Sequence, residues 1–254
     1  MSKLEVINPA HRSEKFTRLC ALGIMTKVPE AGKVKTRLTP PLTQDEAAAL
    51  NICFLHDLSS SMAVAAQRAP AKGVGIYTPV GKESAYDEIL PEGFVLIAQR
   101  GEDFGERLQN AVVDMLAAGF ASVCLINSDS PTVPATSFTE AAAELAKPGD
   151  RIVLGPSDDG GYYLIGLKTF HGRVFEEIEW STERVLEQTL KRAKEIEVPV
   201  HQLPTGVDVD DRVTLQRLCD ELLGRNAPDD IAPNTRKFLR DIVKREGRAR
   251  TWPE

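Results

Sequence analysis

The sequence predicts a three-layer α/β protein in which helices cover both faces of a mostly parallel sheet. Short runs rich in Val, Ile and Leu alternate with longer stretches of helical period, which is the pattern of such a sheet. The chain has 254 residues, of which 42% are hydrophobic and 27% charged, as in an ordinary globular protein. We therefore expect one large domain over 19–224, preceded by a polar extension (1–18) and followed by a helical tail (225–254) packed on it.

Apolar runs of strand length define the expected sheet. An Asp-Gly pair at 159–160 lies between two of these runs and is a hairpin signal. Because a sheet of this class binds ligands at the carboxyl ends of its strands, candidate site residues are sought just after each run. The runs are 19–26, 73–78, 94–98, 121–127, 151–155, 161–167 and 198–203.

The helices are expected from apolar faces of helical period and from capping residues. Thr43 and Glu46 form a capping box at the start of the first helix. Asp103 and Glu106 have the same spacing at the start of the second, in which Phe104 is expected to point inward. Further helices are expected at 135–147, 183–195 and 211–223, and one within the tail.

Composition and charge exclude several classes of function. A net charge of −6 argues against a nucleic-acid binder with a general basic surface. The apolar runs are far shorter than the roughly 20 residues that span a bilayer, and the polar start of the chain lacks the apolar core of a signal peptide. The four cysteines show no paired spacing, which indicates reduced thiols rather than a zinc site. We expect a cytoplasmic protein without a membrane span, and the sequence does not predict an oligomeric state.

The stretch KVPEAGKVKTRL, residues 27–38, has basic residues at alternate positions after the first strand. In an extended chain Lys33, Lys35 and Arg37 would share one side and suit a diphosphate or triphosphate. Gly32 would let the backbone approach such a ligand, whereas the alternative is a solvated charged loop. The P-loop pattern is excluded because it requires glycine where Lys27 stands.

Two acidic segments could complete this site with a divalent cation. Asp129 follows a buried strand, although it could equally open a turn or cap the next helix. Asp208, Asp210 and Asp211 crowd together before another helix, which Asp211 is expected to cap. Such crowding is unfavourable unless cations neutralise it. Asp129, Asp208 and Asp210 are thus candidate metal ligands, and Mg²⁺ or Mn²⁺ suits their oxygen donors best.

The hairpin at 157–161 and the segment at 179–182 are candidates for an acceptor site. Gly160 and Gly161 would allow close backbone approach, and Asp159 beside them could orient a hydroxyl group or a metal-bound phosphate. The alternative is a purely structural hairpin.

An aromatic side chain precedes a helix start in the second of these segments. Trp180, with Ser181 and Thr182, could line an acceptor pocket, although most tryptophans are core residues. We assign GEDFGERLQN, which begins at Gly101, to the element nearest the base of a nucleotide.

Six segments occur in an order that resembles the DUF2064 family of glycosyltransferase-A-like proteins, also described as radical-SAM/selenodomain-associated transferases. That family is similar in turn to the 2-phospho-lactate guanylyltransferases. The resemblance spans Leu19 to Leu218, and the combination of KTRL, SDSP and DGGYYLIGL carries it. The segments are PEAGKVKTRLTP, GEDFGERL, NSDSPTVP, SDDGGYYLIGL, EWSTERVLEQT and VDVDD.

The resemblance implies a glycosyltransferase-A fold, also called the nucleotide-diphospho-sugar transferase fold. By position, the three basic residues at 33, 35 and 37 match the family's phosphate-binding loop. Asp129 matches the metal-binding aspartate, and Asp208 and Asp210 match a second acidic motif. Here the sequence departs from the family pattern, because Asp211 replaces the usual threonine and Asp129 is a lone aspartate.

Two reactions suit this set of residues, since the fold hosts both. The first is metal-dependent glycosyl transfer from a nucleotide sugar to a small acceptor, with Asp129 and Asp159 as catalytic residues and Asp159 as base. The second is nucleotidyl transfer to a small phosphorylated acid, with release of pyrophosphate. A third possibility is a nucleotide sensor without turnover. The sequence contains neither a GxSxG motif nor an HExxH motif, so it does not suggest covalent catalysis or zinc-hydrolase chemistry.

Overall fold

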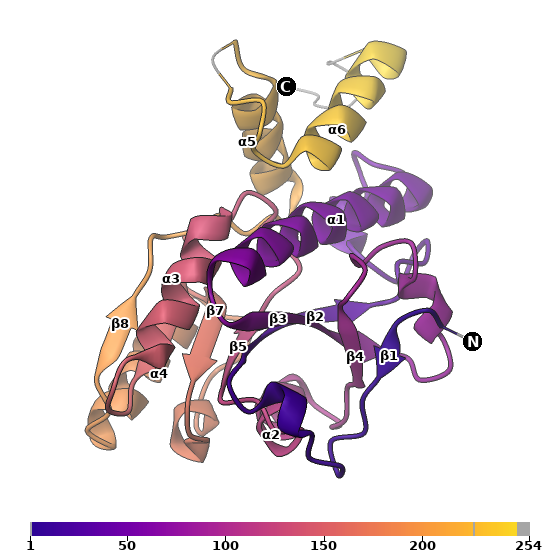
Figure 1. Cartoon of the computed structure of the whole chain (residues 1–254). Coiled ribbons are helices and arrows are strands. Elements are labelled where there is room, and N and C mark those ends of the chain that lie inside the picture. Colours follow the sequence, from indigo (N-terminus) through magenta and orange to yellow (C-terminus); the bar gives the residue numbers. More distant parts are fainter. Residues whose placement is uncertain (1, 226, 248–254) are drawn as a thin grey trace.

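The structure is a computed structural model that describes residues 2–225 and 227–247. Figure 1 shows a central sheet with helices on both sides. Among the described residues the sheet has eight strands in the order β1-β4-β3-β2-β5-β7-β6-β8. Strand β7 is antiparallel to both neighbours, and the other pairs are parallel. The predicted three-layer α/β class with a mostly parallel sheet is therefore confirmed.

The predicted strands and helices all occur, with ends that differ by a few residues at most. The two-residue strand β1 was not predicted, because so short a segment carries no periodicity; it lies within 1–18 and pairs with β4 at the edge of the sheet. The strands are β1 (Glu5–Val6), β2 (Cys20–Lys27), β3 (Ala71–Thr78), β4 (Val95–Ala98), β5 (Ser122–Ile126), β6 (Ile152–Pro156), β7 (Tyr162–Leu167) and β8 (Val200–Gln202). The helices are α1 (Gln44–Arg68), α2 (Phe104–Ala117), α3 (Ala135–Ala146), α4 (Val185–Glu195), α5 (Arg212–Leu223) and α6 (Pro233–Glu246).

Two apolar cores separate the three layers. Alternate residues of the strands point to opposite faces, so Leu22 packs toward α1 and α3 whereas Ala21 packs toward α2 and α4. A third apolar cluster joins the first half of α1 to α5 and α6, outside the sheet. Figure 1 shows these two last helices standing above α1 at one end of the molecule.

Helix α1 begins with the predicted capping box, in which Thr43 and Glu46 each accept a hydrogen bond from the other's backbone N–H. Within the described residues, α1 is also a helix long and apolar enough to cross a membrane by length and composition. More than half of its most apolar window is buried inside the protein, as in the core helix of a globular fold.

The start of α2 differs from the prediction in two ways. Asp103 caps the helix, but the Glu106 side chain accepts from the Glu102 N–H, so the reciprocal box is incomplete. Phe104 was expected to point inward and is 50% exposed. Its ring packs edge to face on Trp180, because the first turn of α2 extends past the core and meets the loop before α4.

The tail expected over 225–254 contributes α6, which contacts α1 and α5. Residues 226 and 248–254 of that range lie outside the described residues. A buried carboxylate fixes the start of α6: Asp57 of α1 accepts hydrogen bonds from the backbone N–H groups of Asn234 and Thr235. These are free donors of a helix N-terminus, so α1 supplies the cap that the chain before α6 lacks.

Candidate functional site

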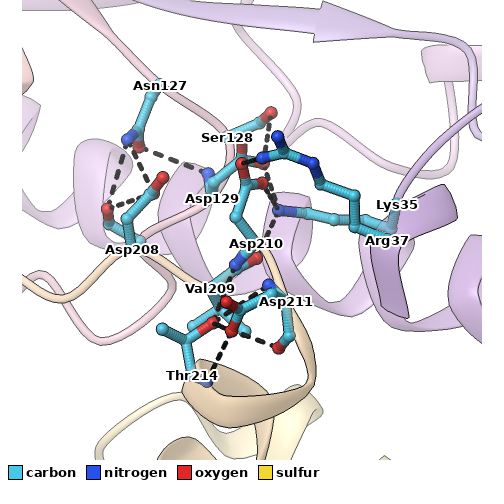
Figure 2. A network of polar contacts seen from close by, with 11 residues as sticks. Lys35, Arg37, Asn127, Ser128, Asp129, Asp208, Val209, Asp210, Asp211 and Thr214 are labelled. Carbon is cyan, nitrogen blue, oxygen red and sulfur yellow. Dashed lines mark hydrogen bonds and ion pairs between the residues drawn. The ribbon is translucent and has the colours of Figure 1, made fainter. Parts of the chain in front are cut away.

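Three carboxylates from two loops meet at the carboxyl edge of the sheet. Asp129 lies in the loop after β5, and Asp208 and Asp210 lie in the segment that leads from β8 to α5. One oxygen from each side chain lies within 4.8 Å of the others. The Val209 N–H donates to the Asp129 carbonyl oxygen at 2.9 Å, and this bond holds the two loops together. The three residues expected to converge therefore do so (Figure 2).

The Lys35 ammonium group lies against this acidic cluster. Its Nζ is 2.7 Å from Asp129 Oδ1 and 3.4 Å from Asp210 Oδ1, and it donates to the Val209 carbonyl oxygen at 2.7 Å. Only 5% of the side chain is exposed, and the ring of Phe54 lies 5.4 Å from Nζ. Burial alone would lower the pKa of Lys35, but the carboxylates of Asp129 and Asp210 outweigh it and raise the pKa.

The basic stretch does not adopt the extended form that was predicted. Lys35 has a left-handed backbone with φ of 48°, and Thr36–Leu38 form a 3-10 turn. The turn brings Arg37 to the same cluster, 3.3 Å from Asp210 Oδ2, with 75% of its side chain exposed. Lys33 instead pairs with Glu30 on the surface. Two of the three cations therefore converge and the third does not, because a turn removes the alternation of an extended chain.

Asp208 is half-buried and is held by two polar side chains of the loop after β5. Its Oδ1 accepts hydrogen bonds from Asn127 Nδ2 at 3.0 Å and Ser130 Oγ at 3.2 Å. Burial raises the pKa of Asp208 to about 7, and the nearby Asp129 carboxylate adds to this effect, whereas the Lys35 ammonium opposes it. A further cation at the cluster would favour the ionised form.

The donor set fits a hard divalent cation. All three donors are carboxylate oxygens, which Mg²⁺ and Mn²⁺ prefer, and they are already held near one another by the loops. The raised pKa of Asp208 shows that the charge of the Lys35 ammonium does not offset the burial and mutual repulsion of the carboxylates. Asp129, Asp208 and Asp210 are thus able to hold such an ion.

A cleft of about 220 Å³ opens beside the cluster. Its charged lining residues are the carboxylates Asp129 and Asp210 and the cations Lys27, Lys35 and Arg37. The remaining lining residues are Val34, Thr36, Asn51 and Ser128. A cleft lined by both cations and carboxylates can bind a metal-bound phosphate group.

Gly32 and Gly101 have structural reasons to be glycine. Gly32 has φ of +73°, and a Cβ there would lie 2.9 Å from the side-chain oxygen of Gln44. Gly101 has φ of +123°, and a Cβ there would lie 3.0 Å from the backbone nitrogen of Arg107 in α2. Both positions require a left-handed backbone next to another chain segment, and neither lines the cleft beside Lys35.

The predicted hairpin between β6 and β7 lies at the same edge of the sheet. Asp159 is close enough to Asp208 to raise its pKa slightly, and its Oδ1 accepts from the Gly161 N–H at 2.9 Å. Gly160, with φ of +88°, packs so closely on Glu183 that a Cβ would lie 2.1 Å from its carbonyl oxygen. Asp159 is therefore near the acidic cluster, and its turn packs against the loop before α4.

Trp180 lies in that loop and packs against the start of α2. The indole nitrogen would lie 2.4 Å from a Cβ at Gly105, and the ring centroids of Trp180 and Phe104 are 5.6 Å apart at an interplanar angle of 80°. Ser181 has a left-handed backbone with φ of 63°, and Thr182 Oγ1 donates to the Glu179 carbonyl oxygen. Ser181 and Thr182 thus form the turn that precedes α4.

Four residues of this region were missed as site residues. Asn127 and Ser130 orient Asp208, Asn51 lines the cleft, and Phe104 packs on Trp180. The polar run NSDS directly after a buried strand was the signal for the first two, because every residue of such a run lies at the ligand-binding edge. Asn51 lies within a long helix, and the sequence alone does not show which helical face meets the cleft.

Comparison with known proteins places these features in a family. A family model described as "Uncharacterized protein conserved in bacteria (DUF2064)" matches residues 57–182. The matched range includes Asp129 and the hairpin at 157–161 but neither the basic stretch nor the second acidic segment. A search of curated proteins found no match.

Solved structures extend the comparison to most of the chain. A "putative nucleotide-diphospho-sugar transferase" from Desulfovibrio desulfuricans G20 is 30% identical, with a TM-score of 0.78, covering 90% of this chain and 97% of its own. CMP:2-keto-3-deoxy-manno-octonic acid synthetase, complexed with CTP, is 10% identical, with a TM-score of 0.50 over 79% of this chain and 96% of its own. The second likeness is one of fold alone.

Proposed function

The chain belongs to the DUF2064 family and is a transferase, and from this premise we propose that it transfers a glycosyl group from a nucleotide-diphospho-sugar to a small acceptor with Mg²⁺ or Mn²⁺ as cofactor. One observation carries the proposal. Lys35 and Arg37 converge on Asp210, which with Asp129 and Asp208 forms a cluster of three carboxylates beside the cleft. Opposite charges held this close suit a diphosphate bound through a divalent cation.

The three carboxylates and two of the cations, Lys35 and Arg37, have roles in this proposal. Asp129, Asp208 and Asp210 would hold the cation, which when bound neutralises charge on the diphosphate oxygens. Lys35 and Arg37 bind the same diphosphate, Arg37 through its exposed guanidinium and Lys35 as a point charge. These contacts strengthen as the diphosphate leaves with the electrons of its bond to the sugar, so they lower the barrier to transfer.

The acceptor is proposed to lie beside the hairpin and the loop before α4, which pack on each other, on the side of the acidic cluster. Its hydroxyl oxygen forms the new bond to the anomeric carbon of the sugar, and Asp159 takes the hydroxyl proton. Support comes from the place of Asp159, which is near enough to Asp208 to raise the pKa of that carboxyl. The backbone at Gly160 and Gly161 and the ring of Trp180 would then bound the acceptor, with Ser181 and Thr182 shaping the loop.

Nucleotidyl transfer is a second candidate, favoured by the number of cations in the cleft. Lys27 lines it together with Lys35 and Arg37, and these charges with a divalent cation match the charge of a nucleoside triphosphate. In that reaction a substrate phosphate attacks the α-phosphate, pyrophosphate leaves, and no base is required.

The two reactions release different products, so one assay separates them. The protein is incubated with Mn²⁺, a mixture of small hydroxyl and phosphate acceptors, and either nucleotide sugars or nucleoside triphosphates. Glycosyl transfer predicts a free nucleoside diphosphate from a nucleotide sugar. Pyrophosphate from a triphosphate, with no nucleoside diphosphate from any sugar donor, would replace the first proposal by the second.

A cytoplasmic location is also part of the proposal. All four cysteines are free thiols, and Cys20 and Cys124 lie in the core with their sulfur atoms 3.8 Å apart and unbridged. Free thiols at this separation suit a reducing compartment. Cell fractionation with an antibody to the protein tests this location.

A further inference from the structure

A second cavity, larger than the cleft, lies between α5 and α6. Its volume is about 480 Å³, within the range of small-molecule sites. The first residue of α5 that lines it is Cys219, eight residues after the N-cap Asp211, and eight residues of helix rise about 12 Å. The cavity is therefore separate from the acidic cluster, and Figure 1 shows α5 and α6 standing apart from the sheet at that end of the molecule.

The cavity gathers positive charge in a chain that is acidic as a whole. Arg225, Arg236, Arg240 and Lys244 line it, with Asp229 as the acidic lining residue, although the net charge of the chain is −6. The last three cations are spaced four apart along α6, so they share one face of the helix. Like charges on one face repel one another unless an anion lies among them.

One of these cations is buried with an unused hydrogen-bond donor. The side chain of Arg236 is 7% exposed, and one end of its guanidinium pairs with the exposed Asp229 carboxylate. Its Nε is buried and has no hydrogen-bond partner. A buried donor without a partner costs about 1–3 kcal/mol. The guanidinium of a residue that lines the cavity is therefore not fully satisfied by the protein itself.

The rest of the wall is apolar. Cys219, Leu222, Leu223 and Val243 line the cavity together with the basic residues. A ligand that fits both parts carries an anionic group at one end and a small apolar body at the other. Arginine is suited to the anionic end, since its planar guanidinium can bind two oxygens of a phosphate at once.

We propose that the cavity between α5 and α6 binds a small organic phosphate, with its phosphate among Arg236, Arg240 and Lys244 and its apolar part on Leu222 and Val243. This site shares no residue with the acidic cluster and goes beyond the proposed transfer reaction. It is a second binding site, for a ligand that does not compete with the nucleotide.

Calorimetry with three probes tests the site on the full chain at low salt. Hexyl phosphate is expected to bind, inorganic phosphate to bind at least tenfold more weakly, and hexanol not to bind. Raising the salt concentration should weaken the binding of hexyl phosphate, because salt screens contacts between exposed charges. No binding of hexyl phosphate, or equal binding of hexanol, would overturn the proposal.

Variants then locate the bound probe. The double substitution of Arg240→Ala and Lys244→Ala removes two exposed cations. It should lower the affinity for hexyl phosphate at least tenfold without lowering the melting temperature of the protein. Lys237→Ala removes an exposed cation of α6 that does not line the cavity and should leave affinity within twofold. Asp210→Asn, in the acidic cluster, should likewise leave the affinity for hexyl phosphate unchanged. Equal loss in the control, or loss in the Asp210 variant, would place the probe elsewhere and refute the site.

Discussion

The Lys35 ammonium group lies 2.7 Å from the Asp129 carboxylate and is almost fully buried beside it. The lysine reaches this position because its own backbone is left-handed, which turns the basic stretch back toward the loop after β5. A buried ion pair whose partners also face a cleft is more costly than a surface pair, since both charges lose water. Lys35 is therefore a positive charge held in a fixed position next to the carboxylates proposed to bind metal.

Replacing Lys35 should weaken nucleotide binding far more than replacing its neighbour. Lys35→Ala is expected to lower affinity for nucleoside diphosphates at least tenfold, about 1.4 kcal/mol, because it removes a buried charge at the cleft. Lys33→Ala is the matched control, since Lys33 pairs with Glu30 on the surface, and it should change affinity less than threefold. Titration calorimetry with Mn²⁺ present measures both. Similar losses in the two variants would mean that Lys35 has no special role.

The raised pKa of Asp208 predicts how stability depends on pH. The folded protein keeps a proton on Asp208 up to about pH 7, whereas an ordinary aspartate has a pKa of 3.8. Between these values the unfolded chain binds fewer protons, so the stability of the metal-free protein falls as pH rises. Asp208→Asn cannot ionise and removes this contribution.

Thermal unfolding in the presence of a chelator measures this effect at pH 5 and pH 7.5. The wild-type melting temperature should fall more over this interval than that of the Asp208→Asn protein. Asp211→Asn serves as the control, because Asp211 caps α5 and asparagine also caps well. Parallel curves for wild type and Asp208→Asn would show that Asp208 ionises normally.

Asp57 is expected to hold α6 on the domain. Its carboxylate is 3% exposed and accepts three hydrogen bonds, from the Asn234 N–H and amide and from the Thr235 N–H. Asp57→Ala leaves these donors without a partner and should cost about 2 kcal/mol of unfolding free energy. Asp241→Ala, at an exposed position on α6, should cost less than about 0.5 kcal/mol.

Denaturant unfolding gives both free energies, and hydrogen exchange reports whether the start of α6 opens. Nucleotide affinity should be unchanged in Asp57→Ala, since Asp57 does not line the cleft and its carboxylate is bonded to the start of α6. An Asp57→Ala protein as stable as Asp241→Ala would show that the cap contributes nothing.

Trp180 offers a test of the acceptor site that leaves the nucleotide site intact. Trp180→Ala is expected to raise the KM for the acceptor at least fivefold, because it removes the ring that packs on Phe104 beside the hairpin. Affinity for the nucleotide should stay within twofold. Steady-state kinetics with either substrate varied separates the two effects, and a change confined to the nucleotide would contradict the assignment. Phe175→Ala, which alters another aromatic pair, is a control for general loosening.

The fold could be predicted from the sequence because its signals are local. Apolar runs and capping residues such as Thr43 and Asp211 mark the ends of elements by themselves, and both act as caps in the structure. Strand β1 and the exposed Phe104 could not be predicted in this way. The first depends on pairing with a distant strand, and the second depends on contact with the loop that carries Trp180.

The candidate site was predictable in its acidic half and less so in its basic half. Asp129 and Asp210 both follow strands of the predicted sheet, so both were expected at its carboxyl edge. Their strands, β5 and β8, are not neighbours, and the long segment after β8 brings Asp210 to Asp129. The conformation of the basic stretch depends on a left-handed residue that is not glycine, for which the sequence gives no signal. As a result Lys35 and Arg37 meet the carboxylates while Lys33 does not.

The central claim is that the acidic cluster binds a divalent cation together with a nucleotide diphosphate. Asp210→Asn and Asp211→Asn change neighbouring aspartates in the same way, but Asp210 belongs to the cluster and Asp211 caps α5. Calorimetric titration of both proteins and wild type with Mn²⁺ and a panel of nucleoside diphosphates is the most direct measurement. We predict that wild type and Asp211→Asn bind alike and that Asp210→Asn binds at least tenfold more weakly. Equal binding by the two variants would contradict the account.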